Sequence, residues 1–220
     1  MRKVFILTLL LSSCSVLDRN NIAPGYSEAF TTLKAAIFGQ QSGYDLNRET
    51  INAIPYASLL LRIGNGPEGL MILESVNKDI HTWVSSDGIR VMIQNGRIIS
   101  TNGLINNLKI INFPKKASDL ERFNLDNVVR FSSYYSFSQP TLIDLKVENF
   151  VSPLRIEQVE ILGISKNLKL VTEEINSRRI RWNSVNRYWV DQSNFTWKSE
   201  QKISPKLPVI YYQVTKKPSY

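Results

Sequence analysis

The sequence predicts a mainly β protein, an antiparallel meander curled into a barrel-like sheet with a short N-terminal helix. Runs of β-branched and aromatic residues follow one another from residue 57 onward, separated by Asn65-Gly66, Asp87-Gly88 and Asn95-Gly96. Such dipeptides favour tight hairpins because both central residues of a type I′ turn need a positive φ. About a dozen strands with few helices favour a strongly curved or closed sheet, since an open sheet of that size leaves exposed edges.

Two helical segments precede the strands. Ser27 is placed as an N-cap and Gly39 as a stop, and the apolar residues between them recur at helical spacing, which predicts an amphipathic helix. A second, short helix is expected over 48–53. It ends before Pro55 because the residue preceding a proline avoids the helical region.

The clearest strand pattern lies between residues 56 and 104. It predicts five sequential antiparallel strands, at 57–63, 70–76, 81–85, 89–94 and 97–101. A capping-box spacing at Ser118 and Glu121 predicts a brief helix after them. Further strands are expected at 127–137, 141–150, 154–162, 169–175, 180–184, 188–190 and 195–198. The segment 203–220 contains three prolines, which predicts an edge strand or an extended tail packed on the sheet.

The first fourteen residues have the parts of a secretory signal. Arg2 and Lys3 precede a short apolar run that ends in Ser12-Ser13-Cys14, and the run is too short to span a bilayer. Leu11-Ser12-Ser13-Cys14 resembles a bacterial lipobox, in which the cysteine is acylated and becomes the first residue of the mature chain. Cys14 is also the only cysteine, whereas a disulfide-stabilised protein carries an even set. The alternative is an ordinary signal peptide with a coincidental cysteine.

These observations predict three parts of the chain. They are a lipoprotein signal peptide at 1–13, a lipidated tether at 14–25 with Cys14 as the attachment site, and a single β-rich periplasmic domain at 26–220. Acyl chains on Cys14 would hold the protein durably to a membrane. Ser15 is not the Asp that commonly retains lipoproteins in the inner membrane. We therefore expect a protein anchored in the outer membrane and facing the periplasm.

Net charge and composition limit the classes of binding partner that we expect. The formal net charge is +8, but the basic residues are spread along the chain without a run of five. A nucleic acid partner is not expected for an exported protein of this kind. Acidic polysaccharide and anionic lipid head groups both suit the charge.

Catalytic chemistry is sparse, and we expect neither an enzyme nor a bound cofactor or metal. His81 is the only histidine and lies within a predicted strand, where a structural role is favoured. No second histidine is present for a zinc cluster, and no glycine-rich phosphate loop is found. Paired carboxylates that hydrolyse a glycosidic bond remain an alternative, with six candidates: Asp126, Asp144, Glu148, Glu173, Glu174 and Asp191.

Aromatic residues are the more suggestive feature. Trp182, Tyr188, Trp189, Phe195 and Trp197 lie within 16 positions among polar residues, as in surfaces that stack on sugar rings or bind proteins. A hydrophobic core is the favoured explanation for most of them. The candidate binding surface comprises one member of this group and four residues from the first hairpins: Arg62, Trp83, Asp87, Arg97 and Trp189. Simple strand, turn and core roles are the alternatives for these five.

Several motifs resemble the group 4 capsule polysaccharide lipoprotein family, GfcB/YjbF. They are Tyr56-Ala57-Ser58 with Leu61-Arg62-Ile63-Gly64, Trp83-Val84-Ser85-Ser86-Asp87-Gly88, Asn95-Gly96-Arg97-Ile98-Ile99, Thr101-Asn102-Gly103-Leu104, Asn186-Arg187-Tyr188-Trp189-Val190-Asp191, Trp197-Lys198-Ser199 and the closing Lys216-Lys217-Pro218. The resemblance covers nearly the whole mature chain. It implies a barrel-like antiparallel sheet and a part in building or exporting a surface polysaccharide.

Three functions follow as hypotheses. The first is an outer-membrane lipoprotein that acts as a non-enzymatic accessory in capsule or exopolysaccharide export, with a glycan or export proteins as partners. The second is a periplasmic hydrolase or lyase that modifies polysaccharide, which needs convergent catalytic groups in a cleft. The third is a structural lipoprotein that assists an outer-membrane barrel, which an exposed apolar patch would favour.

Overall fold

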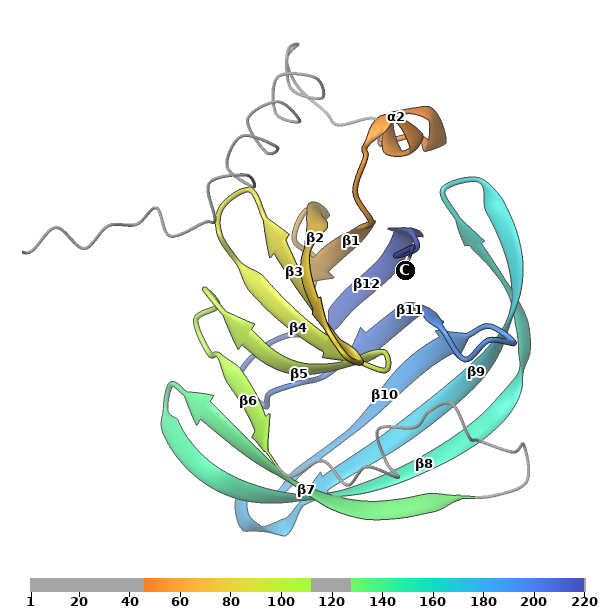
Figure 1. Ribbon diagram of the computed structural model, residues 1–220. Coiled ribbons are helices and arrows are strands. Elements are labelled where there is room, and N and C mark those ends of the chain that lie inside the picture. The colour runs from red at the N-terminus through yellow and green to blue at the C-terminus, as the bar shows by residue number, and fades with distance from the viewer. Residues whose placement is uncertain (1–45, 112–127, 220) are drawn as a thin grey trace, which may run out of the picture.

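Strands that follow one another in the sequence pair with one another in space, and the last strand returns to the first. The computed structural model describes residues 46–111 and 128–219, and in these ranges the chain forms a closed antiparallel barrel of twelve strands (Figure 1). The strands are β1 Ser58–Ile63, β2 Gly69–Asn77, β3 Ile80–Ser85, β4 Arg90–Gln94, β5 Arg97–Asn102, β6 Leu108–Ile111, β7 Val129–Ser138, β8 Thr141–Ile161, β9 Ile164–Ser177, β10 Trp182–Val190, β11 Thr196–Gln201 and β12 Ile210–Lys216. The predicted fold class is confirmed.

The short helix α2, Arg48–Ala53, precedes the barrel as predicted. The Asn47 side chain caps it by accepting a hydrogen bond from the Thr50 amide at 2.9 Å. The Arg48 guanidinium donates to the carbonyls of Ile161 and Thr215, at 2.7 Å each, and so joins the helix to β8 and β12. No helix within the described ranges is long and apolar enough to cross a membrane.

Of the three predicted dipeptide turns, one has the expected type I′ geometry; in Asp87-Gly88 only Gly88 has a positive φ, of 84°, and neither Asn65 nor Gly66 has one. Asn95 and Gly96 have φ values of 46° and 80°, so both central residues of the β4–β5 turn are left-handed as a type I′ hairpin requires. Lys78 in the β2–β3 turn has a φ of 57°. These two tight turns join β2 to β3 and β4 to β5, which pair antiparallel.

The prediction for the C-terminal segment was wrong. Residues 210–216 form β12, which pairs with β1 on one side and β11 on the other and so closes the barrel. Pro205 and Pro208 precede this strand and take no place in its ladder. A strand with two partners has no free edge, so this segment is neither an edge strand nor a tail.

Other boundaries also differ from the sequence patterns. The predicted strands 141–150 and 154–162 are one strand, β8, in which a register shift near Pro153 accommodates the residue that cannot donate to the ladder. Likewise, the predicted strands 180–184 and 188–190 merge into the single strand β10, which begins only at Trp182 because Arg178–Ile180 form a 3₁₀ helix, and β6 was not predicted. The signal peptide, the helix between Ser27 and Gly39, and the brief helix at Ser118 lie outside the described residues.

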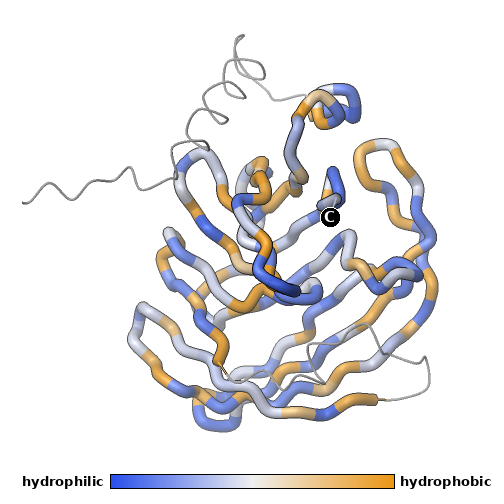
Figure 2. Tube along the Cα trace, in the orientation of Figure 1, coloured by the Kyte–Doolittle hydropathy of each residue, from blue (hydrophilic) through white to orange (hydrophobic). Residues whose placement is uncertain are grey.

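Hydrophobic and polar residues alternate along many strands, as Figure 2 shows. This alternation sends every second side chain into the barrel. The main core gathers Leu59, Trp83, Ile93, Leu145 and Tyr212, each at most 5% exposed, from five different strands. Side chains therefore fill the middle of the barrel.

Candidate functional site

A cavity of about 330 Å³ opens at one end of the barrel. The β2–β3 turn, the β4–β5 turn, the β10–β11 loop and the end of β12 all contribute to its wall. In a meander barrel alternate turns lie at the same end, which is why segments far apart in sequence meet here. The mouth of a β-barrel is a frequent position for small-molecule sites.

The cavity has an apolar floor and a polar rim. Leu59, Trp83, Ile93, Tyr212 and Val214 form the floor and are all buried. The rim carries ammonium, carboxylate, imidazole, amide and hydroxyl groups together with one aromatic ring, from Lys78, Asp79, His81, Asn95, Ser193, Asn194, Phe195 and Lys217. Such a lining combines a surface for the C–H face of a ligand with groups that can hydrogen-bond to its periphery.

Asp191 fixes the β10–β11 loop on the rim. Its carboxylate accepts hydrogen bonds from the backbone and hydroxyl of Ser193 at 2.8 and 2.7 Å, from the Phe195 amide at 3.0 Å and from the Trp197 indole at 2.8 Å. Partial burial by itself raises the pKa of Asp191, but these donors and nearby Lys217 together hold the pKa below its ordinary value. The loop is therefore ordered by an ionised carboxylate before any ligand arrives.

Gly96 anchors the β4–β5 turn beside this loop. Its carbonyl accepts hydrogen bonds from the Tyr212 hydroxyl at 2.7 Å and from the Gln201 amide at 2.9 Å. A Cβ at this position would lie 2.1 Å from the Thr196 hydroxyl oxygen, so only glycine lets the β4–β5 turn approach β11 this closely. The turn and the β10–β11 loop consequently form one packed rim.

His81 lies half-buried in the cavity wall, with its ring 6.3 Å from Trp83 in an edge-to-face arrangement. Burial lowers the pKa of His81 below the ordinary value of 6.5, and Asp79 opposes only part of that effect. The imidazole is therefore neutral at pH 7, where it can donate one hydrogen bond and accept another. Among the described residues, no group of three or more His, Cys, Asp or Glu side chains is arranged to hold a metal ion.

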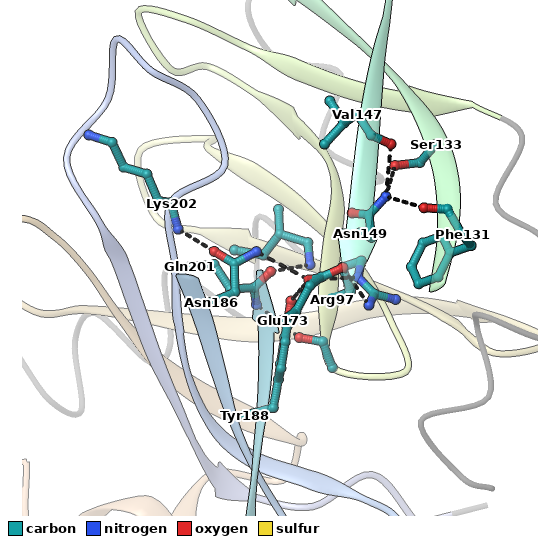
Figure 3. A network of polar contacts seen from close by, with 12 residues as sticks. Arg97, Phe131, Ser133, Val147, Asn149, Glu173, Asn186, Tyr188, Gln201 and Lys202 are labelled. Carbon is teal, nitrogen blue, oxygen red and sulfur yellow. Dashed lines mark hydrogen bonds and ion pairs between the residues drawn. The ribbon is translucent and has the colours of Figure 1, made fainter. Parts of the chain in front are cut away.

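A buried polar network surrounds Glu173 and Arg97, the residue that follows Gly96 (Figure 3). Arg97 and Glu173 form a bidentate pair, with N–O distances of 2.8 and 3.2 Å, and are 2% and 0% exposed. Glu173 also accepts hydrogen bonds from the Tyr188 hydroxyl at 2.6 Å and the Asn186 amide at 3.2 Å. Burial raises the pKa of Tyr188, so that its hydroxyl stays protonated and donates. The network joins β5, β9 and β10 across the barrel interior.

The five predicted binding residues do not form one surface. Trp83 belongs to the cavity floor, whereas Arg97 is buried in the network and presents no exposed group. Arg62 lies against the Tyr211 ring, 4.1 Å from its centroid, and Asp87 accepts a hydrogen bond from Ser85 in the β3–β4 turn. Trp189 is 6% exposed and donates to Glu157 at 2.7 Å in a separate apolar cluster.

Sequence reasoning missed most of the rim. Lys78, Asn95 and Ser193 are turn residues, and nothing in their local pattern distinguishes them from ordinary turns. The usable signal was topological, because the β2–β3, β4–β5 and β10–β11 connections must share one end of a closed meander. The closure itself depended on β12, which the sequence did not place between β1 and β11.

The family comparison agrees with the resemblance carried by the sequence motifs. A family model described as group 4 capsule polysaccharide lipoprotein GfcB, YjbF matches residues 30–214. The chain belongs to this family. As the matched range extends through β1 to β11 and most of β12, the YjbF family assignment covers nearly all of the barrel.

Two curated members of the YjbF family from Escherichia coli K12 are similar over most of their length. Lipoprotein YjbF is 24% identical over 204 residues, with 90% of this chain and 89% of the relative covered. Lipoprotein GfcB is 25% identical over 170 residues, with 74% and 76% covered. The crystal structure of lipoprotein YmcC, also from Escherichia coli K12, superposes with a TM-score of 0.71 at 22% identity and covers 86% of this chain and 96% of that one. That likeness shows a shared fold.

Proposed function

We propose that this protein is a lipid-anchored accessory of capsule or exopolysaccharide assembly, and that it binds a segment of glycan in the cavity without cleaving it. Cys14 carries the anchor in this proposal, and the barrel lies on the periplasmic face of the outer membrane. Membership of a capsule polysaccharide lipoprotein family supports the polysaccharide context.

The observation that carries the binding role is the combination of an apolar floor with a preformed polar rim. Sugar rings present C–H faces that pack on aromatic and aliphatic side chains, while their hydroxyls need hydrogen-bonding partners. Phe195 supplies a ring at the rim, and Asn95, Ser193 and Asn194 supply amide and hydroxyl groups. A volume of about 330 Å³ is at the lower end of the range for ligand sites, and it suits about one or two sugar rings.

The carboxylates favour binding over hydrolysis. Glycosidases use a pair of carboxyl groups on either side of the scissile bond. Among the described residues that line the cavity, Asp79 supplies the one carboxylate, and the Gln94 amide donates to it at 2.8 Å. Glu173 is fully buried in its pair with Arg97, and Asp191 is engaged by the β10–β11 loop. This arrangement supports an accessory that holds glycan.

Export assays on a strain that lacks the native protein test the role of the cavity. His81 and buried Trp83 are two apart on β3 and share the inward face, so His81→Trp adds bulk to the cavity. Met92 on β4 is 38% exposed between the inward residues Val91 and Ile93, so Met92→Trp adds the same indole outside the barrel. At equal protein levels, we expect His81→Trp to lower surface polysaccharide and Met92→Trp to leave it at the wild-type level. Full export with His81→Trp contradicts the proposal.

The anchor needs its own test. Membrane fractionation and intact mass spectrometry of the wild type should recover an outer-membrane protein whose first residue is acylated Cys14. The Cys14→Ala variant should be unacylated and leave the outer membrane fraction. An unacylated wild type that is cleaved elsewhere would contradict lipid anchoring while leaving the cavity's role to the export assay.

A further inference from the structure

Two lysines and one carboxylate share the cavity rim. We propose that the cavity selects a saccharide that carries a carboxylate, such as a uronic acid unit, and that Lys78 and Lys217 bind the acid group. This inference rests on the proposed glycan-binding function and specifies its ligand class.

The first step concerns Lys217, whose position is set by the β10–β11 loop. Its ammonium lies 3.2 Å from the Ser193 hydroxyl, 3.8 Å from the Asp191 carboxylate and 4.5 Å from the centre of the Phe195 ring. Asp191 already accepts four hydrogen bonds, and the 3.8 Å separation is long for a direct hydrogen bond. An ammonium has three donors, so Lys217 keeps donors for a ligand while its neighbours hold it at the rim.

The second step concerns Lys78 in the β2–β3 turn. Lys78 has a left-handed backbone, with a φ of 57°, in the tight β2–β3 turn, and this conformation fixes the direction of its Cα–Cβ bond. The side chain is exposed and lines the cavity. Within the described part of the chain, Lys78 takes part in no ion pair, so its charge is not neutralised by a carboxylate of those residues.

The charge of Lys78 then favours an anionic ligand. Lys78 and Lys217 contribute two positive charges, and they face two negative charges, from Asp79 on the rim and from ionised Asp191, 3.8 Å from Lys217. The half-buried imidazole of His81 contributes no charge at pH 7. Asp79 is also engaged by Gln94. A ligand carboxylate would pair with the Lys78 ammonium, which has no ion-pair partner among the described residues, and would accept from the remaining donors of Lys217, while its ring would contact Phe195 and the apolar floor. A neutral sugar would leave the Lys78 ammonium without a countercharge.

The test measures binding of oligosaccharides to the full-length protein in detergent by isothermal titration calorimetry. The probes are short oligosaccharides cut from the cell's own surface polysaccharide, and the same preparation after its carboxyl groups have been reduced to primary alcohols. We expect the native probe to bind at least about 10-fold more tightly than the reduced one. Lys78→Met and Lys217→Met, which keep much of the aliphatic stem, should each weaken binding of the native probe about 5-fold, with a smaller effect in high salt.

The control variant is Lys146→Met on β8. Lys146 is 58% exposed and does not line the cavity, and its substitution removes the same charge, so the variant's affinity for the native probe should equal that of the wild type. The double variant Lys78→Met/Lys217→Met should bind both probes equally. Persistence of the preference in that double variant would overturn the inference.

Two further outcomes separate this inference from the function on which it rests. Equal binding of the two probes by the wild type, blocked by His81→Trp, overturns selection for a carboxylate and leaves glycan binding intact. A surface polysaccharide that has no carboxyl groups overturns the selection as well. Absence of binding to either probe overturns both the inference and the glycan-binding function.

Discussion

Removal of Arg97 gives the sharpest test of how the barrel is held together. Arg97→Met deletes the guanidinium that pairs with Glu173 but retains an unbranched apolar side chain in the same space. Glu173, which is 0% exposed, then keeps hydrogen bonds from Tyr188 and Asn186 but loses its countercharge. Breaking a buried ion pair from one side costs about 3–5 kcal/mol, because an uncompensated charge stays in a medium of low polarity.

A second variant separates the lost charge pair from lost packing. In Arg97→Met/Glu173→Gln no unpaired charge remains, and the oxygen of the introduced amide can still accept from the Tyr188 hydroxyl. We expect the double variant to recover at least about 2 kcal/mol of the loss, since replacing both members of a buried pair is far less costly than removing one. The free energies of the two substitutions should therefore be strongly non-additive.

Thermal and urea denaturation of full-length protein in detergent, followed by circular dichroism, measures both effects. For a domain of this size a loss of 3–5 kcal/mol lowers Tm by about 6–20 °C. Met92→Trp serves as a control on the outer face and should unfold near the wild-type temperature. An Arg97→Met variant with the wild-type Tm, or a double variant as unstable as Arg97→Met, would refute the reasoning.

Three further predictions concern the rim and the buried tyrosine. Gly96→Ala should lower the free energy of unfolding, measured by urea denaturation, by about 2–4 kcal/mol, because the added Cβ clashes with Thr196 and the backbone is left-handed. Gly163→Ala, with a φ of 75° and open space around it, should lower it by only about 1 kcal/mol. Equal losses in the two variants would contradict the close approach of Gly96 to Thr196. Asp191→Ala should loosen the β10–β11 loop, so that the amides of residues 193–195 exchange hydrogen faster while the strand amides stay protected. Unchanged exchange at these amides would contradict the role of Asp191 in holding the loop. Burial raises the pKa of Tyr188 in the folded state above the ordinary value of 10.0, so its contribution to stability is complete below about pH 10 and is lost as the pH rises further. The free energy of unfolding should therefore fall above about pH 10, and it should fall less steeply in Tyr188→Phe. Equal slopes in the two proteins would contradict a raised pKa of Tyr188.

The first half of the barrel was predictable because its information is local. Asn95-Gly96 specifies both left-handed residues of a hairpin, and the flanking strands then pair with their neighbours in sequence. The short helix was equally local, because Asn47 caps it and Pro55 follows it. Each of these features is decided within about ten residues of chain.

Closure and burial were not predictable in the same way. The prolines near β12 indicated an edge, but its two neighbours are β1, far away in sequence, and β11. Arg97 follows a turn and was expected at a surface, yet Glu173 from β9 lies opposite it and makes burial of its charge tolerable. Trp83 was expected in the same surface and instead forms part of a floor whose rim comes from distant turns. Long-range pairing decides these cases, and one sequence read locally does not reveal it.

The most direct test of glycan binding in the cavity uses the only histidine of the chain as a reporter. The ring signals of His81 should be resolved in a nuclear magnetic resonance spectrum of full-length protein, because no other histidine contributes. Since His81 lines the cavity, titration with oligosaccharides from the cell's own polysaccharide should shift these signals saturably, with the Kd found by calorimetry. Calorimetric binding that leaves the His81 signals unmoved would place the glycan elsewhere and contradict the account.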